Sequence, residues 1–221
     1  MNYSITGIND FFKNSFFIVI VFQVSCQEVK KESASPSSAA EKSIIKTEPQ
    51  KTRLDTILAI FEEKPIYKAR GFDFPIAKPN AKGYYNAQPF GTNNHLGEDW
   101  NAVTGGDSDL GDPIYATANG FVNFATDIGS GWGKIIRIWH TTVDRVVVES
   151  LYAHCDTILV EQGQYVFKGD TIGTIGNAGG IYLAHLHFEI RDDVLLPVGA
   201  GYATETEGYL DPTKFIKAHR Q

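Results

Sequence analysis

Cysteine is scarce in this sequence, with Cys26 and Cys155 the only two among 221 residues. Two cysteines are too few for a disulfide scaffold or for a cysteine-rich zinc module. Any metal would therefore have to be held by histidine and carboxylate side chains. Basic residues are also few: 20 Lys and Arg are scattered among 26 Asp and Glu, for a net charge of -6. The chain therefore lacks the basic surface that phosphate backbones require, and we expect no nucleic-acid partner.

The apolar run near the N-terminus, residues 16–22, is too short to span a bilayer comfortably and has the length of a signal-peptide core. Ser25 and Cys26 follow it, which resembles the lipobox of bacterial lipoproteins, whose cysteine is acylated; Gln23 departs from that motif. We predict a signal peptide or lipoprotein signal over residues 1–26. The protein is then exported to the cell envelope, in the periplasm or on the outer surface, with membrane attachment through Cys26 or the N-terminal segment as an alternative to a cleaved leader.

The next segment, residues 27–51, is rich in Ser, Ala, Lys, Glu and Pro and cannot bury enough apolar surface to order itself, so we predict a disordered tether. Thr52 with Asp55 three residues later is typical of a helix start. Apolar residues then recur at helical spacing up to Pro65: Leu54, Ile57, Leu58 and Phe61. We predict one short helix over residues 52–66, followed by a single domain over residues 67–221.

After Phe72 the helical period is lost, and short runs of β-forming residues alternate with turn signals. The runs are residues 113–116, 120–125, 135–140, 145–153, 171–175 and 185–191. Strands of this length and spacing predict an all-β domain, a small curved antiparallel sheet or sandwich. The glycine-rich stretch 129–133 lacks the Lys-Ser/Thr ending of a phosphate-binding loop, so we predict a hairpin there.

Two histidine patterns suggest a metal site. His185 and His187 lie two residues apart on a predicted strand, so both imidazoles face one side. Asp99 follows His95 by four residues, and we expect Gly97 between them to let the backbone bend so that both converge. Three such ligands with one open position define a catalytic zinc site. With His154 at the end of another predicted strand, the set points to a metal-dependent hydrolase.

Five motifs resemble those of the lysostaphin-type (LytM-like) zinc metalloendopeptidase family. They are H-L-G-E-D at 95–99, G-D-P-I-Y-A-T-A-N-G at 111–120, Y-A-H at 152–154, G-Q-Y-V-F-K-G-D-T-I-G at 163–173 and H-L-H-F-E at 185–189. They occur in the order found in the family and cover roughly the last two thirds of the chain. The resemblance implies a mostly antiparallel β domain with a groove over the metal.

The resemblance also implies roles for five residues. One Zn²⁺ per chain would be held by His95, Asp99 and His187, and His154 and His185 would be the catalytic histidines. The substrates of the family are peptide cross-bridges or stem peptides of bacterial peptidoglycan, so we expect an exported zinc metalloendopeptidase that hydrolyses such peptide bonds. The alternative is a catalytically silent relative that binds peptidoglycan or activates another cell-wall hydrolase. Loss of metal ligands marks those relatives, whereas all five positions are filled here; a regulatory protein partner stays open.

Two neighbours of the motifs suggest further roles. Cys155 directly follows His154, but adjacent strand residues point to opposite faces, so we predict a core cysteine rather than a Cys-His nucleophile. Glu189 shares the face of His187, and we expect it to support that histidine from behind.

Two loops leave questions open. The acidic turn at residues 105–109 offers calcium only a few oxygens, so an Asx-rich turn is favoured over a calcium site. Residues 176–184 replace the Thr-Gly, Ser-Thr-Gly-Pro type of stretch that relatives usually carry before H-L-H. Because this loop borders the groove, the exact substrate stays open.

Overall fold

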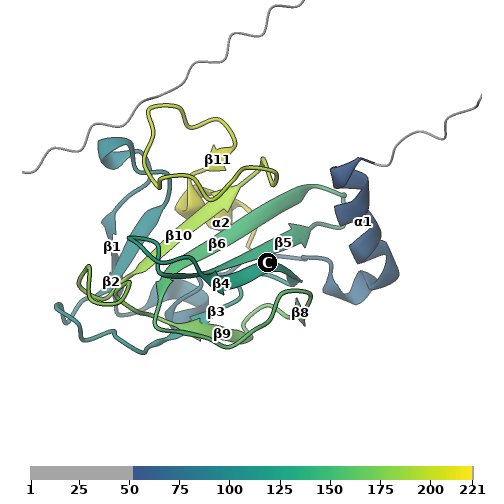
Figure 1. Cartoon of the computed structure of the whole chain (residues 1–221). Helices are drawn as coiled ribbons and strands as arrows, with labels where there is room; N and C mark the ends of the chain where they lie inside the picture. Colours follow the sequence, from purple (N-terminus) through teal and green to yellow (C-terminus); the bar gives the residue numbers. More distant parts are fainter. Residues whose placement is uncertain (1–51, 221) are drawn as a thin grey trace, which may run out of the picture. The chain divides into compact units, whose positions relative to one another are not determined.

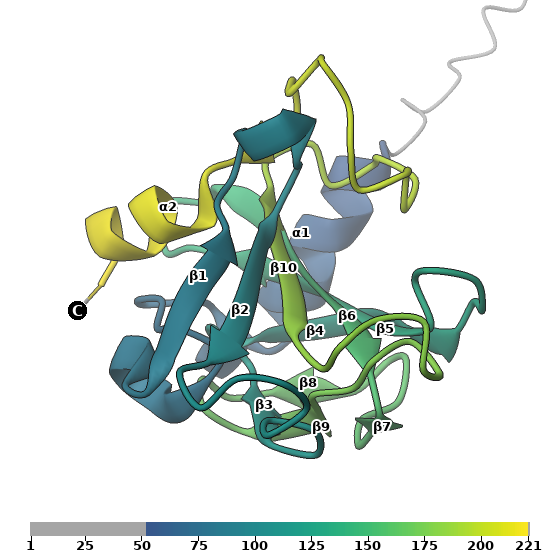
Figure 2. The same cartoon turned by 90° about the vertical axis from the view of Figure 1, so that its left-hand side faces the viewer.

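A computed structural model describes residues 52–220, so the predicted leader and tether, residues 1–51, lie outside the described residues. This part of the chain is mostly β, as predicted, with antiparallel strands and few helices (Figures 1 and 2). The strands are β1 (Tyr84–Gln88), β2 (Glu98–Ala102), β3 (Pro113–Tyr115), β4 (Gly120–Asp127), β5 (Lys134–Thr141), β6 (Val147–Cys155), β7 (Thr157–Ile158), β8 (Tyr165–Val166), β9 (Thr171–Thr174), β10 (Leu186–Arg191) and β11 (Tyr209–Leu210). The helical elements are α1 (Arg53–Glu63), α2 (Pro212–Ala218) and the short turns η1 (Pro65–Tyr67), η2 (Ala77–Ala81) and η3 (Thr92–Asn94).

The strands form two antiparallel sheets. The larger has the order β1-β2-β10-β6-β5-β4-β8, with β11 pairing β10 beside this path, and the smaller has the order β3-β9-β7. Strands β2 and β10 are far apart in sequence yet neighbours in space, which Figure 2 shows from the side of β1. This pairing joins the two histidine motifs of the sequence.

The main hydrophobic core lies on one face of the larger sheet. Alternate residues of β10 and β6 point into it, among them Leu186, Phe188 and Tyr152, and they meet Ile114 of β3 and Ile172 of β9 in the smaller sheet. Burial of these side chains provides most of the apolar stabilisation that holds the two sheets together. The period of two in β10 therefore leaves its other side chains on the opposite face.

That opposite face carries charged and histidine side chains instead. Along β10 these are His187, Glu189 and Arg191, and their cross-strand partners on β6 are Ala153, Leu151 and Glu149. All six are almost fully buried because the chain after β10 folds back over them. A buried polar face of this kind requires internal partners for every charge.

Helix α1 begins where the sequence predicts a helix start. Thr52 and Asp55 form a capping box, in which each side chain accepts from the backbone N–H of the other residue. Ile57 and Phe61 are fully buried and pack with Trp139 and Val147, at the end of β5 and the start of β6. Figure 1 shows α1 at the end of the central strands away from β1 and β2.

Several elements of the structure are absent from the sequence expectations. Strands β1 and β2 are not predicted, because their residues are largely polar and lack clear alternation, and helix α2 follows a stretch in which no helical period was found. Asp211 caps α2 by accepting from the N–H of Lys214, and Ile216 anchors the helix in the main core. Among residues 52–220, no helix is both long enough and apolar enough to cross a bilayer.

Candidate metal centre

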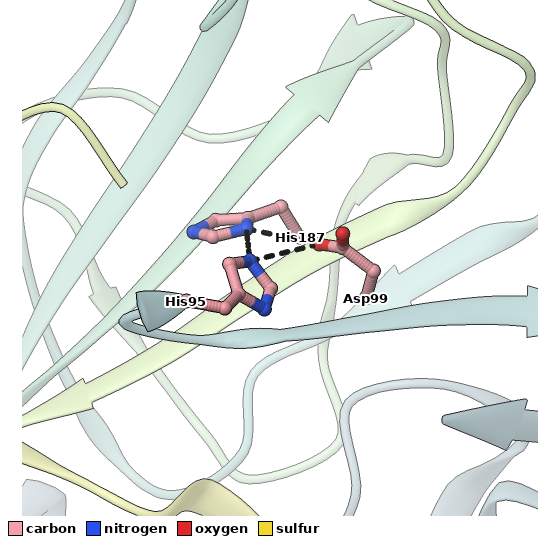
Figure 3. A group of neighbouring side chains, drawn as sticks. All are labelled: His95, Asp99 and His187. Carbon is pink, nitrogen blue, oxygen red and sulfur yellow. Dashed lines mark hydrogen bonds and ion pairs between the residues drawn. The ribbon is translucent and has the colours of Figure 1, made fainter. Parts of the chain in front are cut away.

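Three side chains converge where β2 and β10 pair. His95 precedes β2, Asp99 lies on β2, and His187 lies directly opposite Asp99 on β10. Nε2 of His95 lies 3.0 Å from Nδ1 of His187 and 3.4 Å from Oδ1 of Asp99, and Nδ1 of His187 lies 3.0 Å from that same oxygen. Figure 3 shows the three groups pointing toward one another.

This triangle fits a tetrahedral metal ion. Zinc binds imidazole nitrogen and carboxylate oxygen at about 2.0–2.2 Å, and two ligands of a tetrahedral ion then lie about 3.3–3.6 Å apart. The separations of 3.0–3.4 Å are close to one face of such a tetrahedron. Two nitrogens and one oxygen, with a fourth position left open, are the donor set of a catalytic rather than a structural zinc site.

The outer nitrogen of each imidazole is already engaged. Nε2 of His187 lies 2.9 Å from Oε1 of Glu189, and Nδ1 of His95 lies 3.1 Å from the carbonyl oxygen of Gln88. Because a carboxylate and a carbonyl only accept here, each outer nitrogen donates its hydrogen to them. The inner nitrogens, Nε2 of His95 and Nδ1 of His187, are thereby oriented so that their lone pairs would face a metal ion bound between them and Asp99.

Glu189 is itself held by a buried ion pair. Nε of Arg191 donates to its Oε2 at 2.7 Å, and the rest of the guanidinium donates to the carbonyls of Pro197 and Val198 at 2.8 and 2.7 Å. Glu149 approaches Arg191 at 3.9 Å from β6. Arg137 of β5 forms the second pair of this network, with an N–O distance of 2.7 Å to Glu149, and donates to the carbonyl of Leu196.

The electrostatic environment favours a cation between these residues. Burial would lower the pKa of His187, but hydrogen bonds to Asp99 and Glu189 outweigh it and raise that pKa to about 9. Burial would raise the pKa of Asp99, and its hydrogen bonds with His187 and His95 instead hold it well below its usual range. The field that attracts a proton to this place attracts a divalent cation as well.

Gly97 has a different role from the one expected. Its backbone is not in the left-handed region, so no special bend depends on it. A Cβ there would instead lie 2.7 Å from the carbonyl oxygen of Phe188 and 2.9 Å from Cε1 of His187. Glycine is needed so that the chain between His95 and Asp99 can approach β10 closely.

The other two histidines lie beside this cluster. His185 is just before β10, and its Nδ1 donates to the carbonyl of Leu183 at 2.8 Å, which leaves the Nε2 lone pair on the side where Asp99 lies 3.9 Å away. His154 has a left-handed backbone, φ 60°, which interrupts the regular strand and stores strain. The centroids of the two rings are 4.7 Å apart, and that of His154 is 5.7 Å from His187.

His154 is uncharged in this setting. Burial, followed by the nearby charges of His187 and His185, lowers its pKa to about 3. Its Nδ1 is buried and has no hydrogen-bond partner among the described residues. The structure thus brings together all five residues that the sequence singles out.

A cavity of about 380 Å³ opens above the cluster. Its walls include Trp132 from the β4–β5 hairpin, Tyr182 from the loop 176–184, and Tyr202 from the segment after β10. Tyr182 packs against His154, with ring centroids 5.1 Å apart, and Tyr202 packs against His95, at 5.0 Å. The predicted glycine hairpin at residues 129–133 therefore forms one wall of the groove.

Sequence reasoning missed several residues of the site. The spacing of His187, Glu189 and Arg191 at alternate positions of β10 was a usable signal for a continuous polar face. The carbonyls of Gln88 and Leu183 gave no such signal, because any residue type supplies a carbonyl. Cys155 is a core residue as predicted, and burial raises the pKa of its thiol to about 12, which rules it out as a nucleophile at neutral pH.

The sequence is similar to that of known cell-wall proteins. Residues 93–198 match the profile of peptidase family M23. Lipoprotein NlpD of Yersinia enterocolitica is 43% identical over 81 residues, which are 37% of this chain and 78% of that protein. Murein hydrolase activator NlpD of Salmonella dublin is 35% identical over 125 residues, which are 52% of this chain and 32% of that protein, so the chain spans about a third of its length.

One solved structure that the fold resembles is the antimicrobial peptidase lysostaphin of Staphylococcus simulans. The identity is 25%, the TM-score is 0.43, and the similarity covers 61% of this chain and 48% of that chain.

Proposed function

The chain belongs to peptidase family M23, and on that premise we propose that it is an exported zinc metalloendopeptidase that hydrolyses peptide bonds in bacterial peptidoglycan. The family match agrees with the resemblance to lysostaphin-type peptidases that the motifs predict. The word lipoprotein in the name of the Yersinia relative supports an envelope location with a lipid anchor at Cys26.

The observation that carries the proposal is the triangle of His95, Asp99 and His187, whose inner atoms lie 3.0–3.4 Å apart at the base of the groove. Binding alone does not require two imidazoles and a carboxylate that converge with their outer nitrogens held by hydrogen bonds. A Zn²⁺ held there would act as a Lewis acid toward a water molecule and a peptide carbonyl.

The remaining roles belong to side chains of the groove. His185, with its Nδ1 hydrogen donated to Leu183, has an Nε2 lone pair that can take a proton from the attacking water and return it to the leaving amine. His154 is neutral and lies beside it, where an imidazole N–H can stabilise the oxyanion of the tetrahedral intermediate. The aromatic walls, Trp132, Tyr182 and Tyr202, orient the peptide and limit access of water.

A second function is supported by the names of the curated relatives. The Salmonella protein is called a murein hydrolase activator, and the name favours an activator of a separate cell-wall hydrolase more directly than it favours a peptidase. In that case the groove would bind peptidoglycan or the partner hydrolase without cleaving a bond. Such a role leaves unexplained why His95, Asp99 and His187 are all present and converge.

The two functions separate in one experiment. The full chain is incubated with purified peptidoglycan of several cross-link types, with and without a chelator, and the products are identified by mass spectrometry. We expect chelator-sensitive release of peptides with new amino and carboxyl ends, and no release by H95A. Absence of release with zinc bound, together with faster product release by an added murein amidase, would replace the peptidase with the activator.

A further inference from the structure

The acidic turn that follows β2 contacts the loop that carries His185. Oδ1 of Asp107 accepts the backbone N–H of Ala184 at 2.7 Å, although the two residues are 77 positions apart in sequence. On the other side of Ala184, Nδ2 of Asn101 donates to its carbonyl oxygen at 3.1 Å. Both backbone polar groups of Ala184, its N–H and its carbonyl, are thus held by side chains from one neighbouring segment.

Ala184 is fully buried and directly precedes His185. A buried backbone N–H or carbonyl without a partner costs about 1–3 kcal/mol, so these two side chains satisfy groups that would otherwise destabilise the loop. The carbonyl of Leu183, one residue earlier, accepts from Nδ1 of His185. The orientation of the His185 ring therefore depends on the position of the peptide units around Ala184.

The other end of the same loop is held from the opposite direction. The N–H of His185 donates to the carbonyl of Gly176 at 3.2 Å. Gly176 lies against the backbone of β6, where a Cβ would be 2.3 Å from the carbonyl oxygen of His154. The loop is therefore anchored to the strand of His154 at Gly176 and to the strand of Asp99 at Ala184.

We propose that Asp107 and Asn101 are positioning residues that hold His185 in register with Asp99. This assignment rests on the proposed role of His185 in hydrolysis. The acidic turn is then a clamp on the loop and not a calcium site. The buried carboxylate of the same turn also holds backbone, since Oδ2 of Asp109 accepts from the N–H of Ala102 at 3.0 Å.

The test compares four variants of the full chain: D107A, D107N, N101A and S108A. D107A removes the acceptor of the Ala184 N–H, whereas D107N keeps an oxygen that can accept it and removes the charge. S108A changes the same turn without touching Ala184, because Ser108 bonds to Thr104. We expect kcat to fall about 10- to 100-fold in D107A and N101A, with a smaller change in KM and unchanged zinc content. D107N and S108A keep most of the wild-type kcat.

Two readouts do not depend on hydrolysis. In D107A the amide hydrogen of Ala184 should exchange with solvent faster. The ¹⁵N chemical shifts of the His185 ring should change from those of a single Nδ1–H tautomer to those of a mixture of the two tautomers. If the wild-type chain proves to be an activator without hydrolytic activity, these two measurements alone decide the proposal. An unchanged His185 tautomer in D107A, or kcat in D107A equal to that in S108A, overturns it. A second result would also overturn the proposal. In it, D107N is as impaired as D107A, and the activity of the wild-type chain responds to calcium and to EGTA.

Discussion

Glu189 holds His187 from behind: the two residues lie on one face of β10, and Oε1 of the carboxylate is 2.9 Å from Nε2 of the ring. This contact places a ring hydrogen on Nε2, so that Nδ1, which faces Asp99 and His95, would supply the lone pair for a metal ion. Arg191 holds the carboxylate in turn, so the orientation of the His187 ring depends on a buried ion pair that begins two residues away.

Replacing Glu189 with glutamine should therefore weaken the metal site without removing a ligand. We expect E189Q to bind zinc about 10- to 100-fold more weakly, because the ring of His187 loses its charged acceptor. Competition with a chromogenic chelator measures this on the folded protein. The exposed Glu205 provides a control, and E205Q should bind zinc as the wild type does. Equal affinities for E189Q and E205Q would contradict the support role of Glu189.

The five histidine and aspartate positions should divide into two classes. Variants H95A, D99A and H187A should lose both zinc and hydrolysis, because each removes one corner of the triangle. Variants H154A and H185A should lose hydrolysis but retain zinc. Metal analysis after gel filtration distinguishes the classes, and zinc loss in H154A as complete as in H95A would show that the ligand set is wrong.

Gly97 and Gly131 offer a matched pair of substitutions. In G97A the new methyl group meets a backbone oxygen and His187, so we expect weaker zinc binding and a loss of about 1–3 kcal/mol in unfolding free energy. In G131A it meets only the hydroxyl end of Tyr182, which can swing aside. G131A should keep its zinc and stability and change KM. Denaturant unfolding and zinc titration of both variants check this, and the prediction fails if G131A loses as much zinc as G97A.

His140, remote from the metal triangle, should make stability depend on pH. Its ring is fully buried: Nδ1 donates to the carbonyl of Asn119 at 2.8 Å, and Nε2 accepts from Ser150 at 2.7 Å. Burial lowers its pKa from 6.5 to about 4. As the pH falls from 6.5 toward 4, His140 becomes protonated in the unfolded chain but stays neutral in the folded chain. The contribution of His140 to the free energy of unfolding therefore declines.

We therefore expect the stability advantage of wild type over H140Q to narrow between pH 7 and pH 4, by at most about 3 kcal/mol. Urea unfolding at several pH values measures the difference. S150A disturbs the same hydrogen bonds but keeps the titrating ring, so its pH dependence should follow that of the wild type. A constant difference between wild type and H140Q across this range would show that the ring is not kept neutral by the fold.

Much of the site could be predicted because its chemistry needs particular residue types at short spacings. His95 with Asp99, and His185 with His187, are visible as pairs, and alternation along a strand places the second pair on one side. Their convergence could be inferred only through family resemblance. It depends on the pairing of β2 with β10, and β2 itself reads as a polar segment.

Other features could not be predicted because they depend on tertiary proximity. The bond from Asp107 to Ala184 joins positions 77 apart, and the acidic turn alone suggested calcium as an alternative. Gly97 was correctly singled out, but for bending rather than for close packing against β10. The left-handed backbone of His154 has no local signal at all, since histidine adopts it rarely and only when the surrounding structure compensates the strain.

The packing of α1 places this helix away from the groove. Helix α1 rests against Val147, where β6 begins, whereas His154 lies near the end of the same strand, roughly 23 Å away. No side chain of α1 lines the cavity above the metal triangle, so this helix and the groove lie toward opposite ends of one strand.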